Sequence, residues 1–226
     1  MKPDELCRCL RLLGEPPTTA PTPTMTALKA PAGSISADRI GARIGSDDAA
    51  GLAPGPLVPA AVLVPFVRGS DPAVLLTLRN PHLTKHAGQV SFPGGRIDPG
   101  DSGPEFAALR EAHEEIALNP ADVEITGRLG DYVTGTGYSI TPVLGLLPEG
   151  RELDALHLRP SPFEVQAVFT LPLSVLLDPA APERRRAEFR GSMREFWVWP
   201  HPEHYIWGAT AAILVHLAER LRRAQG

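Results

Sequence analysis

Cysteine is scarce in this chain of 226 residues: only Cys7 and Cys9 occur, both near the N-terminus. With no further cysteine to pair with, the sequence excludes a disulfide framework, and it also excludes a zinc site built from several cysteines. We therefore expect two reduced thiols in a reducing cytoplasm.

Strong net charge and long apolar runs are also lacking. The formal net charge is −4, which argues against a broad nucleic-acid surface because such surfaces are strongly basic. The longest apolar runs, at 56–67 and 209–218, fall short of the roughly 20 residues that cross a bilayer. Nothing of signal-peptide type opens the sequence. We expect a soluble cytoplasmic monomer or homodimer with no nucleic-acid or membrane partner.

What the chain does have is an ordinary globular composition, with 43% hydrophobic and 21% charged residues. Its length predicts a single domain with one active centre. The proline- and threonine-rich stretch at 15–26 has too little apolar surface to fold. We therefore divide the chain into a partly flexible N-terminal segment at 1–35 and a folded domain at 36–226. A turn of helix near 7–14 remains open, and a modest helix is expected near 36–44.

Runs of β-branched and leucine residues, separated by turn signals such as "RGSDP", predict consecutive strands. Pro104 suits the first turn of a helix that continues to about Ala117, and a second helix closes the chain with arginines in its last turn. Such a pattern predicts an α+β fold, a mixed sheet with helices packed on it. The predicted strands are 59–67, 73–79, 89–95, 123–133, 138–147, 164–171 and 193–199, and the predicted helices are 104–117 and 206–223.

Glutamates crowd the second half of the first of these helices, at Glu111, Glu114 and Glu115. At about 100° per residue, Glu111 and Glu115 lie about 40° apart, with Glu114 on the same side. Like charges four residues apart destabilise a helix by about 0.2–0.5 kcal/mol, and acids in its last turns oppose the helix dipole by roughly 0.3–1 kcal/mol each. A divalent cation would reverse this penalty, because Mg²⁺ and Mn²⁺ prefer clustered carboxylate oxygens. The alternative is an ordinary solvated acidic face.

Around this cluster, from Gly95, the chain reads "GRIDPGDSGPEFAALREAHEEIAL". This stretch resembles the Nudix box. The positions that match the box are Gly95, Arg110, Glu111, Ala112, Glu114, Glu115 and Leu118. The interval from Gly95 to Arg110 is one residue longer than in the general box, and the acid expected midway is represented by Asp101 or Glu105.

The final glycine of the box is replaced by Ala117. Alanine in the left-handed conformation that glycine adopts easily costs about 1 kcal/mol. We therefore expect the helix end to shift, using Asn119 before Pro120.

The segment just upstream, "LLTLRNPHLTKHAGQVSFPGGRID" at 75–98, resembles the signature of the coenzyme A pyrophosphatase branch of the Nudix hydrolases. Segments 137–145, 162–177 and 205–214 are similar to that branch as well, and the longer spacing before Arg110 is usual in it. The resemblance implies a Nudix fold, a mixed sheet sandwiched by helices. It also implies hydrolysis of coenzyme A and its thioesters at the pyrophosphate, giving 3′,5′-ADP and a 4′-phosphopantetheine fragment.

Two other functions remain open. One is hydrolysis of another nucleoside diphosphate derivative, such as ADP-ribose or a dinucleotide. The other is a non-catalytic nucleotide-binding module, whose usual mark would be loss of the box carboxylates, and all three are present here.

The predicted metal site uses Glu111 and Glu115 as direct ligands of Mg²⁺ or Mn²⁺, because they share a helix face. By resemblance to the family, the carbonyl of Gly95 is a third ligand. Glu114 is expected to bind a second metal or to act as a base towards water. Glu164 is an alternative base, and a plain acid at a strand edge is an equally good interpretation of it.

Basic residues complete the predicted site. The guanidinium of Arg110 is expected to hold a carboxylate bidentately, from the 98–105 loop or from the cluster itself. We expect one or two of the positive groups near the box to meet the phosphates of the substrate. The candidate substrate-binding residues are Arg79, His82, Lys85, His86, Gln89 and Arg96. The arginines at 184–186 are expected to form a charged turn before a strand, with contact to a 3′-phosphate as the alternative.

Overall fold

The computed structural model describes residues 1–13, 56–189 and 192–225. The predicted helix near 36–44 and the stretch at 15–26 lie outside these residues. Within the described part of the chain, no helix is long and apolar enough to cross a membrane.

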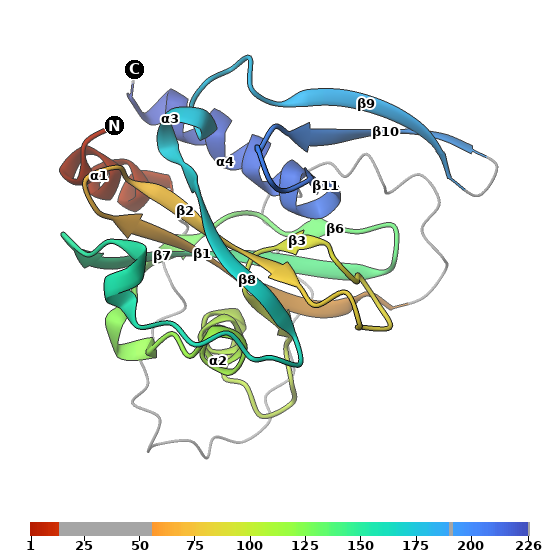
Figure 1. The fold of residues 1–226 in the computed structure, drawn as a ribbon, viewed down its shortest axis with the longest axis horizontal. Coiled ribbons are helices and arrows are strands. Elements are labelled where there is room, and N and C mark those ends of the chain that lie inside the picture. The colour runs from red at the N-terminus through yellow and green to blue at the C-terminus, as the bar shows by residue number, and fades with distance from the viewer. Residues whose placement is uncertain (14–55, 190–191, 226) are drawn as a thin grey trace.

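A mixed sheet forms the centre of the molecule (Figure 1). Strand β1 (Val58–Arg68) runs parallel to β7 (Tyr138–Glu149) and antiparallel to β2 (Ala73–Arg79). Most of β1 is buried, which suits an apolar strand that is covered on both faces. The strands that extend this sheet are β3 (Val90–Ser91), β4 (Gly94–Arg96), β5 (Glu124–Arg128), β6 (Tyr132–Val133) and β8 (Val165–Pro172).

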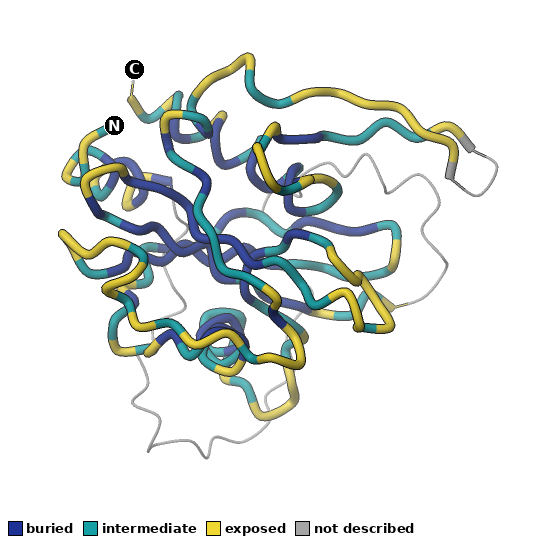
Figure 2. Tube along the Cα trace, in the orientation of Figure 1, coloured by how far each residue is buried: buried dark blue, intermediate teal, exposed yellow. Residues whose placement is uncertain are grey.

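Helices cover both faces of this sheet. α2 (Pro104–Ile116) packs on one face, whereas α1 (Pro3–Leu13) and α4 (Gly208–Gln225) pack on the other (Figure 1). Two buried clusters result, one on each side of the sheet, and the sheet between them is the most buried part of the chain (Figure 2). The prediction of an α+β fold with a mixed sheet sandwiched by helices is confirmed. The remaining short helices are η1 (Pro120–Asp122), η2 (Leu153–Leu156) and α3 (Leu173–Leu176).

A smaller antiparallel sheet consists of β9 (Glu183–Phe189), β10 (Ser192–Trp199) and β11 (Ile206–Trp207). The arginines at 184–186 lie in β9, so the prediction of a charged turn there is wrong. Pairing with β10 gives these arginines partners that the local sequence does not reveal. The guanidinium of Arg184 lies 4.4 Å from the ring centroid of Trp197, and Arg186 forms an ion pair with Glu195.

The N-terminal helix α1 belongs to the hydrophobic core. Its buried side chains are Leu6, Cys9, Leu10 and Leu13. The helix packs against α4, where Arg220 donates a hydrogen bond of 2.7 Å to the carbonyl oxygen of Leu13. The sequence left helix formation near 7–14 open because a helix this short is marginal on its own, and packing against α4 stabilises it. Cys7 is partly buried, Cys9 is buried, and neither forms a disulfide within the described residues.

Two predicted strands are each divided in the structure. The strand predicted at 89–95 is divided into β3 and β4, and the strand predicted at 123–133 into β5 and β6. The break before β4 is at Pro93, whose carbonyl oxygen accepts a hydrogen bond of 2.8 Å from the backbone N–H of Leu63. Because of this break, β4 pairs with β1 instead of continuing β3 along β2. It thereby brings Gly94 and Gly95 beside the end of α2.

Helix α2 ends at Ile116, and Ala117 adopts the left-handed conformation with φ 55° and ψ 27°. The predicted shift of the helix end is therefore wrong. The backbone N–H groups of Ala117 and Leu118 still bond to carbonyl oxygens of the last turn, at 2.9 and 3.4 Å. Asn119 instead caps η1, where its side chain accepts a hydrogen bond from the backbone N–H of Ala121.

Replacing Ala117 by glycine should raise the free energy of unfolding by about 0.5–1 kcal/mol, because glycine adopts positive φ without steric cost. Chemical denaturation of the wild type and Ala117→Gly measures this change. The matched control is Ala212→Gly in the interior of α4, which should destabilise by about 1 kcal/mol. A destabilising effect of Ala117→Gly would contradict the account of the helix end.

Candidate active site

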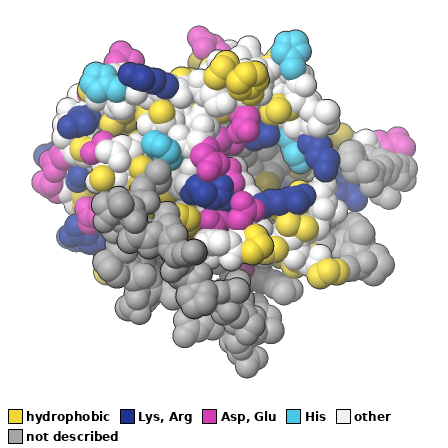
Figure 3. Space-filling model, turned by 90° about the horizontal axis from the view of Figure 1, so that it is seen from below, with side chains coloured by type: hydrophobic (Ala, Val, Ile, Leu, Met, Phe, Trp, Pro, Cys, Tyr) yellow, Lys and Arg dark blue, Asp and Glu magenta, His cyan; other side chains and the backbone are white. Residues whose placement is uncertain are grey.

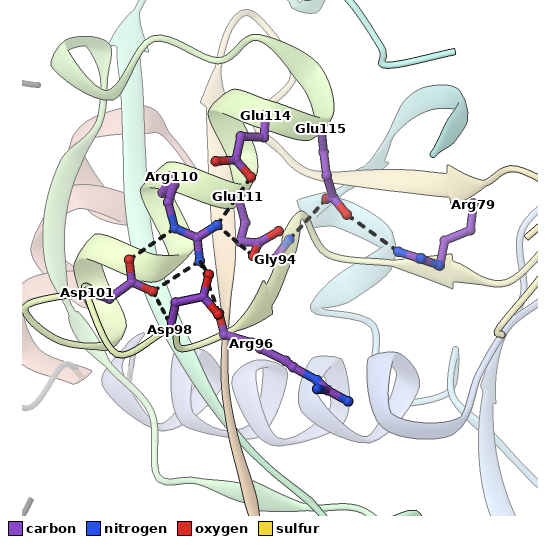
Figure 4. Close-up of polar contacts among 9 residues, drawn as sticks. All are labelled: Arg79, Gly94, Arg96, Asp98, Asp101, Arg110, Glu111, Glu114 and Glu115. Carbon is purple, nitrogen blue, oxygen red and sulfur yellow. Dashed lines mark hydrogen bonds and ion pairs between the residues drawn. The ribbon is translucent and has the colours of Figure 1, made fainter. Parts of the chain in front are cut away.

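The last two turns of α2 present the predicted glutamates to the edge of β4 (Figure 4). Their side chains differ strongly in exposure, with 18% for Glu111, 56% for Glu114 and 4% for Glu115. The three carboxylates therefore have different environments although they lie within five positions. Acidic and basic side chains gather across the middle of this face of the molecule, beside a hollow (Figure 3).

Glu115 is the buried member of the group. Its Oε2 accepts a hydrogen bond of 3.1 Å from the backbone N–H of Gly94, and its Oε1 lies 3.4 Å from Nη1 of Arg79. Burial raises the pKa of Glu115 to about 7, and the charges of Glu111 and Glu164 add to the rise, although the contacts with Gly94 and Arg79 oppose it. Ionising this carboxylate in the folded chain is therefore costly without further positive charge.

Glu111 lies directly against Gly95. A Cβ atom at position 95 would stand 2.5 Å from the carboxyl carbon of Glu111, so a larger residue there would displace this carboxylate. Burial raises the pKa of Glu111, and the charges of Glu114 and Glu164 raise it further, whereas hydrogen bonding to Arg110 lowers it.

Arg110 connects the helix to the loop before it. Its Nε and Nη2 donate hydrogen bonds of 3.0 Å each to the two carboxylate oxygens of Asp101, a bidentate pair. Its Nη2 also donates to the carbonyl oxygen of Arg96 at 3.1 Å, and its Nη1 contacts Glu111 at 2.9 Å and Glu114 at 3.2 Å. The guanidinium of Arg110 thus fixes the loop between β4 and α2, and it neutralises part of the negative charge of Glu111 and Glu114.

Of the two acids considered for the middle of the box, Asp101 is the one that reaches Arg110. The carboxylate of Glu105 instead lies 3.8 Å from the guanidinium of Arg128. The backbone N–H of Asp98 donates a hydrogen bond of 2.7 Å to Asp101, which fixes the loop further.

The predicted substrate-binding residues are not all brought together. Arg79 reaches Glu115, and Arg96 follows the two glycines on β4. In the exposed loop before β3, His86 and Gln89 bond to each other at 2.8 Å. The remaining members of that loop, His82 and Lys85, are exposed.

Glu164 is exposed in a turn beside the end of β2. The carbonyl oxygen of Glu164 accepts a hydrogen bond of 2.8 Å from the backbone N–H of Asn80, whose side chain donates to the carbonyl oxygen of Pro162 at 2.9 Å. Because the charge of Glu164 raises the pKa of both Glu111 and Glu115, its carboxylate lies within electrostatic reach of the acidic group. Sequence reasoning missed Asn80, because its contact spans 82 residues and leaves no local pattern.

The donor set fits a hard divalent cation. Within the described residues, no three histidine, cysteine, aspartate or glutamate side chains form a metal cluster. The predicted set needs only two such side chains, Glu111 and Glu115, together with the backbone carbonyl of Gly95. All three donors are oxygens, as Mg²⁺ and Mn²⁺ prefer, and a cation would offset the burial and the mutual repulsion that raise the pKa values of Glu111 and Glu115.

Comparison with known proteins places the chain in a family. A family model described as the NUDIX domain matches residues 57–190. The uncharacterized Nudix hydrolase NudL of Escherichia coli strain K12 is 43% identical over 159 residues, which are 70% of this chain and 80% of that protein. NudL of Enterobacter sp. strain 638 has the same identity and coverage. Among solved structures, the Nudix hydrolase RenU from M. smegmatis is 22% identical, with a TM-score of 0.47 over 75% of this chain and 88% of that chain.

The matched region includes the box from Gly95 to Glu115 and the turn that carries Glu164. With a family model over more than half of the chain and relatives at 43% identity, the chain belongs to the Nudix hydrolase family, whose members cleave nucleoside diphosphate derivatives.

Proposed function

We propose that this Nudix hydrolase cleaves the pyrophosphate of coenzyme A and its thioesters, giving 3′,5′-ADP and 4′-phosphopantetheine or acyl-phosphopantetheine. The observation that carries the proposal is the position of segment 75–98, the stretch that resembles the coenzyme A branch. This segment forms most of β2, together with β3, β4 and the loop between β2 and β3, and it supplies two groups that contact the carboxylate of Glu115, Arg79 and Gly94. A branch-specific segment that borders the reacting centre is well placed to select the substrate.

The proposed cation ligands are Glu111, Glu115 and the carbonyl of Gly95, with Glu114 available for a second ion. When bound, a divalent cation neutralises phosphate charge and acidifies an attacking water. The protein holds the proposed cation ligands in position. Arg110 holds Glu111 and the loop before α2 in fixed positions, and the N–H of Gly94 orients the carboxylate of Glu115.

Glu114 and Glu164 are the candidate bases, and their contacts favour Glu164. The carboxylate of Glu114 is paired with Arg110 at 3.2 Å, so it is already engaged in the ion pairs of the box. Glu164 forms no ion pair within the described residues, and its turn is held to β2 through Asn80. In this proposal Glu164 accepts the proton of the attacking water.

Product analysis tests the substrate. With Mn²⁺, the purified chain should convert coenzyme A to 3′,5′-ADP, and it should leave ADP-ribose and NADH intact under the same conditions.

EDTA should abolish turnover, and Glu111→Gln should lower it by roughly 10²-fold or more. The matched control is Glu219→Gln on the exposed side of α4, which should retain full activity. If coenzyme A stays intact while ADP-ribose or a dinucleotide is cleaved, the proposed substrate is wrong. A wild type that binds these nucleotides and cleaves none of them would instead support the non-catalytic alternative.

Steady-state kinetics of two matched variants test the base. Glu164→Gln should lower kcat by roughly 10²–10⁴-fold with little change in KM, as expected for loss of a general base. Glu114→Gln should have a smaller effect on kcat, because Arg110 already pairs with that carboxylate. A larger loss of kcat in Glu114→Gln than in Glu164→Gln would reverse the assignment.

A further inference from the structure

Arg96 and Tyr138 form a pair at the edge of the site. Arg96 ends β4 and Tyr138 begins β7, and both strands pair with β1, opposite Ala60 and Val58 respectively. Nη2 of Arg96 donates a hydrogen bond of 3.0 Å to the hydroxyl of Tyr138. The guanidinium carbon of Arg96 also lies 5.7 Å from the centroid of the tyrosine ring, within the range of a cation–π contact.

The partner of Arg96 distinguishes it from the other arginines of the site. Arg79 and Arg110 both contact carboxyl groups of the site. Within the described residues, Arg96 forms no ion pair, and the neighbouring Asp98 lies 3.7 Å from Arg110 instead. A neutral phenol orients the guanidinium of Arg96 without cancelling its charge. That charge therefore stays available for an anion.

Tyr138 is itself held in a fixed position by a tight turn. Its backbone N–H donates to the hydroxyl of Thr134 at 3.0 Å, and its carbonyl oxygen accepts from the backbone N–H of Thr134 at 2.9 Å. Gly137 supplies the positive φ of 87° that this turn requires. Because the backbone of Tyr138 is fixed in this way, its side chain starts from a defined position beside Arg96.

The location of Arg96 connects this pair to the reacting centre. Arg96 directly follows Gly95, and its carbonyl oxygen accepts a hydrogen bond of 3.1 Å from Arg110. Its side chain, however, extends away from the three glutamates (Figure 4). We infer that Tyr138 is a positioning residue that holds the guanidinium of Arg96 ready to bind a phosphate group of the substrate. This inference rests on the proposed function, because it assumes a phosphorylated substrate at this site.

Coenzyme A carries two groups that the guanidinium of Arg96 can bind: the pyrophosphate and the 3′-phosphate. Substrates with and without the 3′-phosphate, coenzyme A and 3′-dephospho-coenzyme A, distinguish them. If only the KM for coenzyme A rises on loss of Arg96, the 3′-phosphate is the group bound. If KM rises equally for both substrates, the pyrophosphate is bound.

Kinetics of single and double variants test the inference. Arg96→Ala should raise KM by at least about tenfold, as expected for loss of charge-assisted hydrogen bonds, with little change in kcat. Tyr138→Phe keeps the ring and removes the hydroxyl, so KM should rise by about fivefold, the value of one ordinary hydrogen bond. In the Arg96→Ala background, Tyr138→Phe should have no further effect, because the tyrosine acts through the arginine. Glu219→Gln, on the exposed side of α4, is the control and should match the wild type.

The inference is overturned if Tyr138→Phe leaves KM unchanged, or if it costs as much in the Arg96→Ala background as in the wild type. A fall in kcat and in the thermal midpoint without a rise in KM would show a merely structural role and would overturn it as well. If the wild type does not cleave coenzyme A, the proposed substrate fails. The Arg96 and Tyr138 variants are then measured with the nucleoside diphosphate derivative that the wild type does cleave. The KM changes described above then support or overturn the inference for that substrate.

Discussion

The contacts of Arg110 are the interaction on which the rest of the site depends. Helix α2 ends with three acids, an arrangement that the helix dipole and mutual repulsion both oppose. Arg110 compensates for part of this repulsion, because it pairs with Glu111 and Glu114 while its other edge binds Asp101 and the carbonyl of Arg96. The same guanidinium therefore fixes the loop that leads from β4 into the helix.

Glu115 is the acid that Arg110 does not reach, and its environment follows from the packing of β4. The strand break at Pro93 lets β4 pair with β1, so that the N–H of Gly94 points at the buried carboxylate. A Cβ atom at Gly94 would overlap the backbone of β1, and one at Gly95 would overlap Glu111. Gly94 is needed because β4 lies directly against the backbone of β1, whereas a side chain at position 95 would displace the carboxylate of Glu111.

Much of this arrangement was predictable from the sequence. Apolar runs located the long strands, and the 3.6-residue period of α2 placed Glu111 and Glu115 together. The features that were missed depend on distant partners. The helical state of 7–13 requires the surface of α4, and the strand at 184–186 requires the facing strand β10. The left-handed conformation of Ala117 has an intrinsic cost, which the backbone hydrogen bonds of Ala117 and Leu118 to the last turn of α2 offset. The side-chain contacts of Asn80 and Tyr138 join residues far apart in the sequence.

We propose that the acids at the end of α2 destabilise the cation-free chain and form a site for a divalent cation. The measurement that decides this is the unfolding free energy of the wild type and of Glu115→Gln, near pH 8, in EDTA and in excess Mn²⁺. The pKa of Glu115 rises from 4.5 to about 7 on folding. The protonated carboxyl of Glu115 therefore stabilises the folded chain in full below pH 4.5, and this stabilisation is lost as the pH rises through about 7. In EDTA the variant should be more stable than the wild type, by up to about 3 kcal/mol. Excess Mn²⁺ should stabilise the wild type, by about 2.7 kcal/mol at a hundredfold excess over Kd, and should have little effect on the variant. A wild type that Mn²⁺ does not stabilise, or a variant that it stabilises equally, would contradict the account.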